Sequence, residues 1–350
     1  MEEVPLAPAA ILRDAVRAIE SSRRRTAVVV DQDGHLLGTI TDGDIRRLLL
    51  SGGNLESNVT KAMNTNPIIA PEGSSQGALQ KKMNSANILC IPLINSKGLY
   101  VSLIHASDLF QDGGHKSESN FFAGVIMAGG LGSRLAPLTN NLPKPMVDIA
   151  GVPLLERLLI QLRDMGITKA FVAVNHLAHV IEDHIEDGSR LGMDVRYLRE
   201  EERLGTAGAL SLLPEKPDGP IVVMNGDILT TSDFNALYSF HLDQNAAITA
   251  AAIDYRIDIP YGVFVADGAV VKGLVEKPSQ KFLCNAGIYA VSPEILEMIP
   301  QSFYNMTDLI DACLNSDRNV AVFPLHEYWS DIGTPGDLEK ARTAFKEFNK

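Results

Sequence analysis

Cysteine is scarce in this chain, and long apolar runs are missing from it. Only three cysteines occur in 350 residues, Cys90, Cys284 and Cys313, and their spacing fits neither a metal site nor a disulfide framework. We therefore expect a protein of the reducing cytoplasm. No stretch approaches the roughly 18 uninterrupted apolar residues of a membrane span. The first residues lack a basic stretch followed by an apolar core, so the sequence predicts neither a membrane segment nor a signal peptide.

Basic charge is also in short supply. The chain has 31 Lys and Arg against 43 Asp and Glu, which makes the formal net charge −12. Nucleic-acid binders are usually basic, so this balance argues against a nucleic-acid partner. An acidic protein can still bind nucleotides, because phosphate sites are local and metal ions assist them. The composition, with 45% hydrophobic and 21% charged residues, is typical of a globular protein. With 350 residues, the chain is long enough for two domains with sizeable cores.

A polar segment that contains Gly and Ser, residues 110–120, separates a short N-terminal part from a longer C-terminal part. Such composition is typical of linkers. We predict an N-terminal module over residues 1–112, a linker over residues 113–121 and a C-terminal domain over residues 122–350.

The N-terminal part contains an internal repeat. Two β-branched strand patterns, residues 26–30 and 36–41, flank a turn and precede a helical pattern at residues 45–50. The same order returns roughly 64 residues later, with strands at 88–94 and 99–104 and a helix start at 107–110. We predict two copies of one small α/β unit, stacked so that each covers the apolar face of the other.

The repeat resembles a tandem pair of CBS domains over about residues 8–112. The signature lies in the first copy, where residues 38–44 read Gly-Thr-Ile-Thr-Asp-Gly-Asp. The resemblance implies that Thr41 and Asp44 bind the ribose and phosphate of an adenine nucleotide such as AMP or ATP. In the second copy Asp108 is kept, but His105 replaces the threonine. A purely structural or dimerising module is the alternative, in which the aspartates cap helices.

The C-terminal part alternates short apolar strands with helices. Strand patterns lie at residues 125–127, 171–175 and 221–224, and helical patterns at 153–165 and 176–185. This order predicts a Rossmann-like α/β fold with a mostly parallel sheet and helices on both faces. Because ligands of such sheets bind at the carboxyl ends of the strands, the glycines after residue 127 and Asp227 are expected to share one cleft.

A glycine-rich loop follows the first of these strands. Residues 128–145 read Ala-Gly-Gly-Leu-Gly-Ser-Arg-Leu-Ala-Pro-Leu-Thr-Asn-Asn-Leu-Pro-Lys-Pro. This is not a Walker A sequence, because no Gly-Lys-Ser/Thr follows at the required spacing. The run resembles the signature of the sugar-1-phosphate nucleotidyltransferases, which include the mannose- and glucosamine-1-phosphate guanylyltransferases. The resemblance extends over roughly residues 122–345.

The resemblance implies roles for several residues near the loop. The nucleotide is expected at Ala128, Gly129, Gly130, Gly132 and Ser133, with its phosphates held by the loop N–H groups from Gly129 to Ser133. Arg134 and Lys144 are the expected catalytic cations, since charge develops on phosphate oxygens during transfer. Asp227 and Asp331, from an Asn-Gly-Asp and a Trp-Ser-Asp-Ile-Gly-Thr motif, are the expected Mg²⁺ ligands. The alternatives are solvated surface cations, a helix N-cap at Asp227 and a turn residue at Asp331.

The base and the sugar are expected at two further segments. By the resemblance, the base contacts are Glu200, Glu202, Gly205, Thr206 and Gly208, and the sugar-phosphate contacts are Tyr261, Gly262, Glu276, Lys277 and Asn285. A carboxylate can accept two N–H bonds from guanine, so the glutamates favour GTP. The glutamates can also be a solvated acidic loop, and Glu276 and Lys277 an exposed ion pair. Asp308 is a weaker candidate that can equally cap a helix, and His176, His179 and His184 are given no function.

We therefore predict an enzyme that transfers a nucleotidyl group from an NTP to a hexose or amino-hexose 1-phosphate, with Mg²⁺ as cofactor. A uridylyl- or thymidylyltransferase is the near alternative. A nucleotide-sugar-dependent glycosyltransferase and a non-catalytic nucleotide sensor are the alternatives of other classes. Adenine nucleotide is expected to act at the CBS pair, and the chain is expected to form a homo-oligomer.

Overall fold

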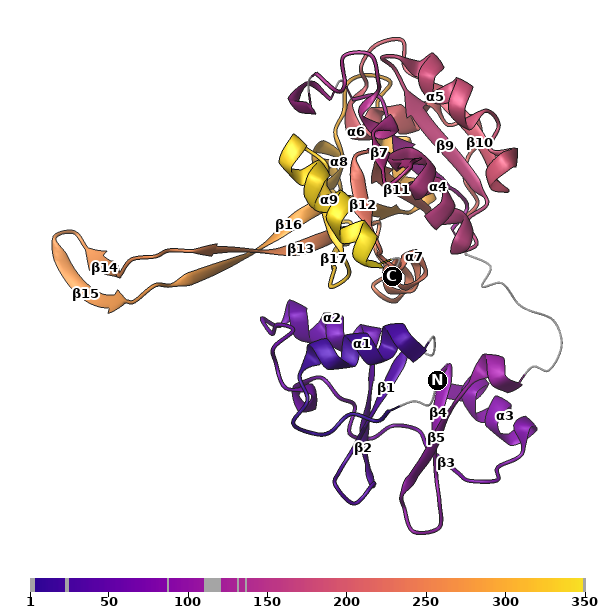
Figure 1. Ribbon diagram of the computed structural model, residues 1–350, viewed down its shortest axis with the longest axis vertical. Helices are drawn as coiled ribbons and strands as arrows, with labels where there is room; N and C mark the ends of the chain where they lie inside the picture. The colour runs from indigo at the N-terminus through magenta and orange to yellow at the C-terminus, as the bar shows by residue number, and fades with distance from the viewer. Residues whose placement is uncertain are drawn as a thin grey trace. The chain divides into compact units, whose positions relative to one another are not determined.

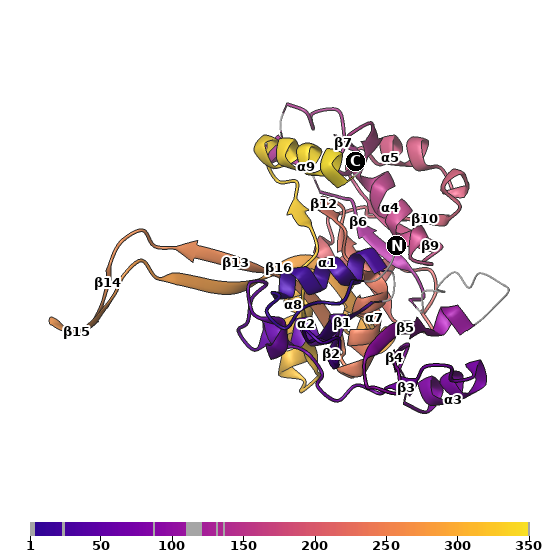
Figure 2. The same cartoon turned by 60° about the horizontal axis from the view of Figure 1, so that its bottom comes forward.

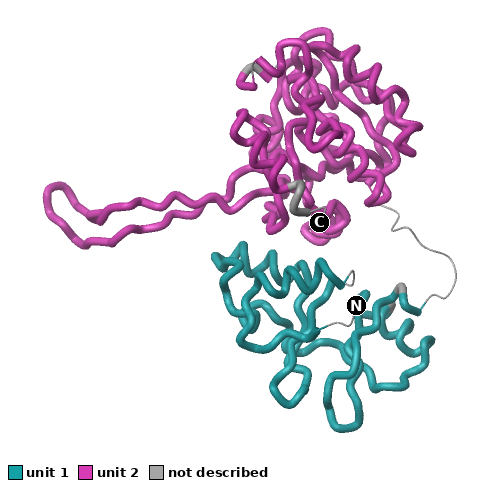
Figure 3. The backbone as a smooth tube through the Cα atoms, in the orientation of Figure 1, with its two compact units in different colours: residues 1–115 teal, residues 116–350 magenta. Residues whose placement is uncertain are grey.

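The computed structural model describes residues 4–22, 25–86, 88–109, 121–130, 132–135 and 137–348. The chain divides into two compact units, Met1–His115 and Lys116–Lys350 (Figure 3). This division falls inside the segment predicted as a linker, of which residues 113–120 lie outside the described residues. No helix in the described ranges combines the length and hydropathy that a membrane crossing needs.

The first unit contains the same small motif twice. In the first copy the elements are α1 (Leu12–Ser22), β1 (Thr26–Val30), β2 (Leu36–Thr41), α2 (Asp42–Leu50) and the 3-10 helix η1 (Val59–Lys61). In the second copy they are β3 (Ala70–Pro71), α3 (Gln76–Ala86), β4 (Cys90–Ile94), β5 (Tyr100–His105) and the 3-10 helix η2 (Ala106–Leu109). Helices α1 and α3 begin at residues 12 and 76, and strands β1 and β4 at residues 26 and 90, so both pairs are 64 residues apart. The predicted repeat is confirmed.

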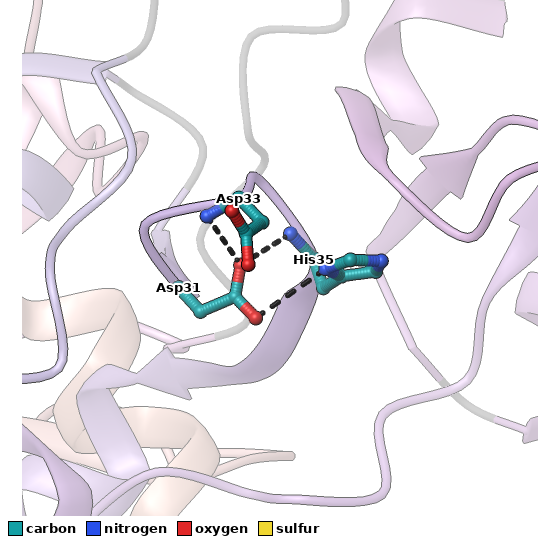
Figure 4. Close-up of side chains that lie close together, drawn as sticks. All are labelled: Asp31, Asp33 and His35. Atoms are coloured by element: carbon teal, nitrogen blue, oxygen red, sulfur yellow. Dashed lines mark hydrogen bonds and ion pairs between the residues drawn. The ribbon is translucent and has the colours of Figure 1, made fainter.

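The two hairpins also share their turn chemistry. Asp31 Oδ1 accepts the backbone N–H groups of Asp33 at 2.9 Å and His35 at 2.8 Å (Figure 4). Asn95, 64 residues later, accepts the N–H groups two and four residues further along, at 2.9 and 3.1 Å. These are Asx turns, in which the side chain fixes the tight connection between two strands. The close approach of Asp31, Asp33 and His35 is therefore explained by the turn and indicates no metal site.

The two copies do not share one core. Ile40 and Ile45 belong to an apolar cluster formed by the first copy, whereas Met83 and Ile91 belong to a separate cluster in the second. The copies meet at their turns, where the N–H of Tyr100 donates to the carbonyl of Gly34 at 2.9 Å. Each copy therefore has its own cluster, and the expectation that each copy covers the apolar face of the other stays a prediction.

A seven-stranded sheet forms the second unit. In spatial order its strands are β10 (Asp194–Arg199), β9 (Lys169–Val174), β6 (Gly124–Met127), β11 (Ile221–Asn225), β16 (Ser279–Val291), β13 (Ile248–Asp258) and β17 (Val320–Pro324). Strand β16 is antiparallel to both of its neighbours, and the other adjacent pairs are parallel. The predicted mostly parallel sheet is confirmed.

Helices cover both faces of this sheet, because successive side chains of a strand point to opposite faces. Ile126 and Val172 face the helices α4 (Leu154–Asp164), α5 (Ala178–Ile185) and α7 (Phe234–Asp243). Val125 and Phe171 face the elements α6 (Gly205–Gly208), η6 (Ala209–Leu212), η7 (Pro293–Met298) and α8 (Met306–Asn315). Strands buried on both sides explain why the sequence shows continuous apolar runs rather than alternation.

Further elements complete the unit. They are η3 (Ser133–Leu135), η4 (Lys144–Met146), β7 (Asp148–Ile149), β8 (Val152–Pro153), η5 (Ser189–Leu191), β12 (Ile228–Thr230), β18 (Trp329–Asp331) and α9 (Pro335–Phe348). A separate cluster of buried apolar side chains joins η3, β7, β12 and α9, with Leu135, Ile149, Leu229 and Leu338 among its members.

Strands β13 and β16 continue beyond the sheet as a two-stranded ribbon. The pairing of β13 with β17 ends at Ala252, whereas its pairing with β16 runs on from Ile253 to Asp258. A second hairpin, β14 (Val263–Asp267) and β15 (Val270–Val275), lies at the far end. Figures 1 and 2 show that this ribbon, drawn in orange, projects away from the body of the unit. We call residues 253–284 the arm.

One histidine lies inside the core of the second unit. His241 on α7 is 1% exposed, and its two ring nitrogens lie 2.9 Å from the hydroxyls of Thr249 and Ser292. The Ser292 hydroxyl donates to the carbonyl of Ala246, so we assign the ring proton to Nε2, which donates to Ser292. Burial lowers the pKa of His241 below 6.5, and the ring is therefore neutral in the folded protein.

We expect the free energy of unfolding to fall as the pH drops below 6.5. The unfolded state then binds a proton that the folded state does not, which costs up to about 1.4 kcal/mol per pH unit until the folded pKa is reached. Thermal unfolding at pH 7.5 and 5.5 should show a larger loss for the natural chain than for His241→Gln. His176→Gln, at an exposed position, should keep the full loss, and equal losses in all three proteins would contradict the assignment.

Candidate active site

The cleft lies where the strand order of the sheet reverses. From β6 the chain proceeds outward to β9 and β10, and it then returns to place β11 on the other side of β6. The loops after β6 and β11 therefore diverge and leave a crevice between the carboxyl ends of the two strands. This cleft, with a volume of about 440 Å³, is lined by the glycine loop and by Asn225, Gly226 and Asp227. The expected meeting of the glycine loop with Asp227 is confirmed.

The glycine loop passes so close to other groups that side chains do not fit. Gly132 has a φ of +61°, and a Cβ there would lie 2.9 Å from the Cβ of Lys144. A Cβ on Gly129 would lie 2.9 Å from Oε1 of Glu200. Gly129, Gly130 and Gly132 line the cleft. At Gly129 and Gly132 only glycine leaves this space free, whereas a Cβ on Gly130 would have no atom within 4 Å. The loop therefore presents bare backbone to whatever the cleft binds.

The two ends of the predicted phosphate loop differ from its middle. Ala128 is 1% exposed, and its N–H donates to the carbonyl of Ala173 at 2.9 Å. This N–H is therefore used by the sheet and is not available to a phosphate, while a contact of Ala128 with another part of the nucleotide stays a prediction. Ser133 begins η3, and its side chain lies outside what the structure describes.

Lys144 joins two aspartates that are far apart in the sequence. Its Nζ lies 2.5 Å from Oδ2 of Asp227 and 3.6 Å from Oδ1 of Asp331. Strand β12 begins directly after Asp227 and pairs antiparallel with β18, with Ile228 opposite Asp331. The N–H of Ile332 also donates to the carbonyl of Asp227 at 2.9 Å. This pairing brings the two carboxylates together at the cleft.

The Lys144 side chain is buried although it is charged. The residue is 7% exposed and stands between Pro143 and Pro145, which start the 3-10 helix η4 with a fixed backbone. A buried ammonium is costly unless it is paired, and here Asp227 and Asp331 supply the pairing. The alternative of a solvated surface lysine is excluded for Lys144.

Asp331 has unused capacity for a ligand. Its Oδ1 is buried and has no hydrogen-bond partner among the described residues. Burial raises the pKa of Asp331 and the Asp227 carboxylate raises it further, while Lys144 and Arg134 lower it. A buried carboxylate oxygen without a hydrogen bond, with Lys144 Nζ 3.6 Å away and a second carboxylate beside it, is the type of donor that Mg²⁺ takes. Asp227 and Asp331 therefore fit the metal that the sequence leads us to expect.

Two arginines add positive charge to the cleft. Arg134 is exposed, and its Nη1 lies 3.7 Å from where a Cβ on Gly333 would stand. Both Arg134 and Arg203 line the cleft. Together with Lys144, these side chains offer three cations to a ligand that carries several negative charges.

Of the predicted base contacts, Glu200 is the best placed. It lines the cleft, and its Oε2 accepts the N–H of Leu204 at 2.8 Å. Burial raises the pKa of Glu200, and the bond from Leu204 opposes this rise. Glu202 is exposed and does not line the cleft. Its position fits the alternative interpretation, a solvated acidic residue.

The Gly-Thr-Ala-Gly turn that follows forms α6. Gly205 and Thr206 line the cleft, whereas Gly208 does not. A Cβ on Gly208 would lie 2.7 Å from the carbonyl oxygen of Ser302, and its N–H donates to the carbonyl of Tyr304. The second glycine of the turn is therefore needed for close packing of the backbone, which corrects the direct role predicted for Gly208.

The structure does not bring the predicted sugar contacts to the cleft wall. Tyr261, Gly262, Glu276 and Lys277 lie together near the outer half of the arm, where the N–H of Lys277 donates to the carbonyl of Tyr261 at 3.2 Å. None of these four lines the cleft. Asn285 lies at the root of the arm, where its amide contacts the Tyr289 hydroxyl at 2.7 Å.

The root of the arm touches the cleft wall. The side chain of Asn285 accepts the N–H of Gly287 at 2.9 Å. A Cβ on Gly287, which has a φ of +69°, would lie 2.5 Å from Nδ2 of Asn225. Asn225 lines the cleft. The predicted sugar contacts are therefore divided between the cleft, with Asn285 beside it, and the arm.

The regulatory candidates of the first unit start helices. The Thr41 N–H and hydroxyl both donate to Oδ2 of Asp44, at 2.8 and 2.7 Å, in a capping box. Asp108 likewise accepts the N–H of His105 at 2.9 Å. A cavity of about 360 Å³ in this unit is lined by Leu6, Thr26 and Tyr100 among others, and by none of the three regulatory candidates.

Arg203 and Phe303 are among the residues that line the cleft without having been predicted. Arg203 stands inside the segment that was predicted to contact the base, but a single arginine in an acidic loop carries no positional signal. Phe303 is 61% exposed and belongs to the segment that contacts α6. Nothing in the local sequence marks it, and only the exposure of a large aromatic ring beside the cleft does so.

Several weaker candidates have structural roles. Asp308 accepts the N–H of Asn305 at 2.8 Å and completes a capping box of α8. This is the helix-capping role that was the alternative for Asp308. His184 contacts Glu156 at 2.6 Å between α5 and α4, and His176 and His179 are exposed. None of these histidines lines the cleft.

Comparisons with known proteins agree with this geometry. The sequence profile of the nucleotidyl transferase family matches residues 123–347, and that of the CBS domain matches residues 2–51. A mannose-1-phosphate guanyltransferase from Candida albicans is 34% identical over 227 residues, or 61% of this chain and 62% of that protein. The catalytic subunit beta of mannose-1-phosphate guanylyltransferase from Drosophila pseudoobscura is 32% identical over 61% of this chain and 60% of its own length. The chain thus spans about three fifths of the curated relatives it matches.

A solved structure is similar to the second unit. The crystal structure of HddC from Yersinia pseudotuberculosis superposes with a TM-score of 0.51 at 30% sequence identity, and covers 64% of this chain and 99% of HddC. A complex of HddC with GMP-PN gives a TM-score of 0.50. The family match covers well over half of the chain and includes the glycine loop, Lys144 and both aspartates. This chain therefore belongs to the nucleotidyl transferase family and carries a CBS domain at its N-terminus.

Proposed function

We propose that this chain transfers a nucleotidyl group from a nucleoside triphosphate to a sugar 1-phosphate and releases pyrophosphate. The observation that carries the proposal is the buried Lys144, held between Asp227 and Asp331 at the end of the glycine loop. A site that only stored a nucleotide would not need a desolvated cation beside two carboxylates. Such a cation can stabilise negative charge that develops on phosphate oxygens.

The reaction exchanges one phosphorus–oxygen bond for another. A phosphate oxygen of the sugar 1-phosphate attacks the α-phosphorus, and the bond from that phosphorus to pyrophosphate breaks. No general base is required, because the attacking oxygen is already ionised. The backbone of Gly129, Gly130 and Gly132 would hold the triphosphate, Arg134 the departing pyrophosphate, and Lys144 the phosphate groups that react. The protein thus contributes positioning and electrostatic stabilisation.

Asp227 and Asp331 are the residues that would hold Mg²⁺. When it is bound, Mg²⁺ neutralises charge on the phosphate oxygens of the nucleotide. The buried Oδ1 of Asp331, which has no hydrogen-bond partner among the described residues, supports this assignment. The site lies beside the loop that would hold the phosphates.

GTP is the proposed nucleotide, and a hexose or amino-hexose 1-phosphate the proposed acceptor. Glu200 is half-buried at the cleft and can accept N–H bonds from guanine. The names of the relatives from Candida albicans and Drosophila pseudoobscura, and the GMP-PN complex of HddC, support a guanine nucleotide. The uridylyl and thymidylyl alternatives are tested in the experiment below.

The first unit is proposed to regulate the enzyme by binding an adenine nucleotide. The match of residues 2–51 to the CBS domain supports this. In the structure Thr41 and Asp44 bond to one another, so a nucleotide that binds them must replace this bond. We place the enzyme in the cytoplasm, as its few cysteines lead us to expect.

A matrix of substrates tests the function. GTP, UTP, dTTP and ATP are each combined with mannose, glucose and glucosamine 1-phosphates, and pyrophosphate release is measured with and without added AMP or ATP. We expect one GTP pair to exceed every UTP and dTTP pair by at least tenfold. If none of the substrate pairs released pyrophosphate, the proposed transferase activity would be contradicted. A preference for UTP or dTTP would contradict the proposed base. Transfer of sugar from an NDP-sugar instead would indicate the glycosyltransferase alternative.

A further inference from the structure

The arm is an apolar surface without a cover. Eleven of the 22 large apolar side chains that are exposed in the described residues lie within residues 253–284. Tyr261, Phe264 and Leu274 are exposed by 73%, 65% and 58%. Such a concentration of exposed apolar side chains marks an interaction site. A two-stranded ribbon in water is also only marginally stable by itself, so this arm is expected to pack against another surface.

The backbone of the arm is open at its edges as well. Strand β17 stops pairing with β13 at Ala252, and strand β11 pairs with β16 only at residues 288–291. Within the arm, each strand therefore has one edge that no neighbouring strand of the sheet covers. Open edges of this kind accept a strand or a loop from another chain. The arm thus offers both apolar side chains and backbone groups to a partner.

Charge favours a second copy of this chain as that partner. Residues 253–284 contain four Asp and Glu and four Lys and Arg, so the arm is neutral. The rest of the chain carries the whole formal charge of −12. Two acidic bodies repel one another, whereas a neutral arm can contact an acidic body without this penalty. The arm is therefore the part of one copy best suited to touch another.

The arm also carries residues away from the cleft they are expected to serve. Asn285 lies beside the cleft wall, and Ser279 begins the same strand six residues earlier. Six strand residues span about 20 Å, and Lys277 lies further out still. A lysine side chain is too short to return over that distance. In the structure, the pairs that join Ile253–Asp258 to β16 hold Lys277 away from its own cleft.

We propose that the arm completes the cleft of a second copy. In a two-fold symmetric dimer, each arm lies over the cleft of the other copy and presents Glu276 and Lys277 to the sugar phosphate there. Two-fold symmetry lets both arms make the same contact. Phe303, the exposed ring at the rim of the cleft, is a suitable contact for the apolar side chains of the arm. This inference rests on the proposed sugar-phosphate substrate.

Complementation between two inactive proteins tests the exchange. One copy carries Lys144→Ala, which inactivates its cleft and leaves its arm unchanged. The other carries Glu276→Gln and Lys277→Ala, which remove the proposed sugar-phosphate contacts of its arm and leave its cleft unchanged. Purified heterodimers, selected with two different affinity tags, should recover about half of the natural turnover, because one of their two sites is intact. Heterodimers as inactive as the parent proteins would show that each arm serves its own cleft and would overturn the proposal.

Crosslinking tests the contact without any reference to activity. A photoreactive amino acid replaces Lys277, and natural-abundance chains are mixed with nitrogen-15-labelled chains that lack it. We expect crosslinks from the probe to labelled peptides of the glycine loop or of residues 299–305. Crosslinks confined to the probe-bearing chain would overturn the proposal. If no substrate pair releases pyrophosphate, the proposed function fails, and this crosslink still decides whether the arm reaches a second copy.

The mass in solution gives a further check. The natural chain should have twice the mass of a single copy by light scattering, and the variant Phe264→Ser with Leu274→Ser should have the mass of one copy. Both positions lie outside the apolar clusters of the unit, so the variant should still fold, with the circular dichroism spectrum of the natural chain. The matched control, Leu242→Ser with Leu314→Ser, removes exposed apolar side chains elsewhere and should stay dimeric. A natural chain that remains a single copy would overturn the proposal.

Discussion

Lys144→Ala should lower the turnover of pyrophosphate release by about 10³-fold, the range seen when a positioned charge is removed from a phosphoryl-transfer site. The variant loses the one described cation that contacts both Asp227 and Asp331. It should still fold, because the Asp227 and Asp331 side chains are 29% and 43% exposed and water can solvate them. Steady-state kinetics and a thermal melt followed by circular dichroism measure the two effects.

A matched lysine separates the role in the cleft from a general loss of charge. Lys216 also pairs with a carboxylate, that of Glu297, but both side chains are exposed and outside the cleft. Lys216→Ala should keep natural kinetics, since exposed ion pairs contribute little. Near-natural turnover in Lys144→Ala would contradict the role that we assign to this lysine.

Asp227→Asn should lower turnover by about 10²-fold and raise the Mg²⁺ concentration needed for half-maximal activity. The substitution keeps the shape of the side chain but removes the negative charge that binds a divalent cation. The substitution also removes the carboxylate that lies 2.5 Å from Lys144 Nζ. Part of the loss of turnover is therefore expected to come from a changed position of Lys144. Activity over a range of Mg²⁺ concentrations measures the first effect.

Direct binding of a metal ion distinguishes a ligand from a residue that only orients Lys144. Titration with Mn²⁺, followed by electron paramagnetic resonance, should show weaker binding in Asp227→Asn than in the natural chain. Asp243→Asn, at an exposed position beyond the cleft, should bind as the natural chain does. Full activity of the natural chain in excess chelator would contradict the metal assignment.

The local patterns of the sequence predicted the repeat and the sheet well. Turn residues, strand patterns and helix starts recur in the first unit. The structure repeats the Asx turn of Asp31 at Asn95 and the helix start of Asp44 at Asp108. These features depend on hydrogen bonds within four residues. They are therefore predictable from the sequence, because the donor and the acceptor of each hydrogen bond lie in the same short segment.

The composition of the cleft was predictable only in part. Gly129, Gly130, Gly132 and Asp227 could be placed because they follow strands of one parallel sheet, and the carboxyl ends of such strands meet. Arg203 and Phe303 could not, since they approach the cleft through the packing of α6 against residues 302–305. A contact of that kind leaves no periodic trace in the sequence.

Local patterns in the sequence were enough to predict the two-unit order, the α/β class of the second unit, and the glycine loop and Asn-Gly-Asp segment of its cleft. Only the tertiary structure decided that Lys144 is buried between Asp227 and Asp331, because the pairing of β12 with β18 joins segments about a hundred residues apart. It also decided that Glu276 and Lys277 lie on an arm and not at the cleft. The physical reason is the same in both cases. Side-chain periodicity reports which face of an element is buried, whereas strand pairing between distant segments decides which of those faces meet.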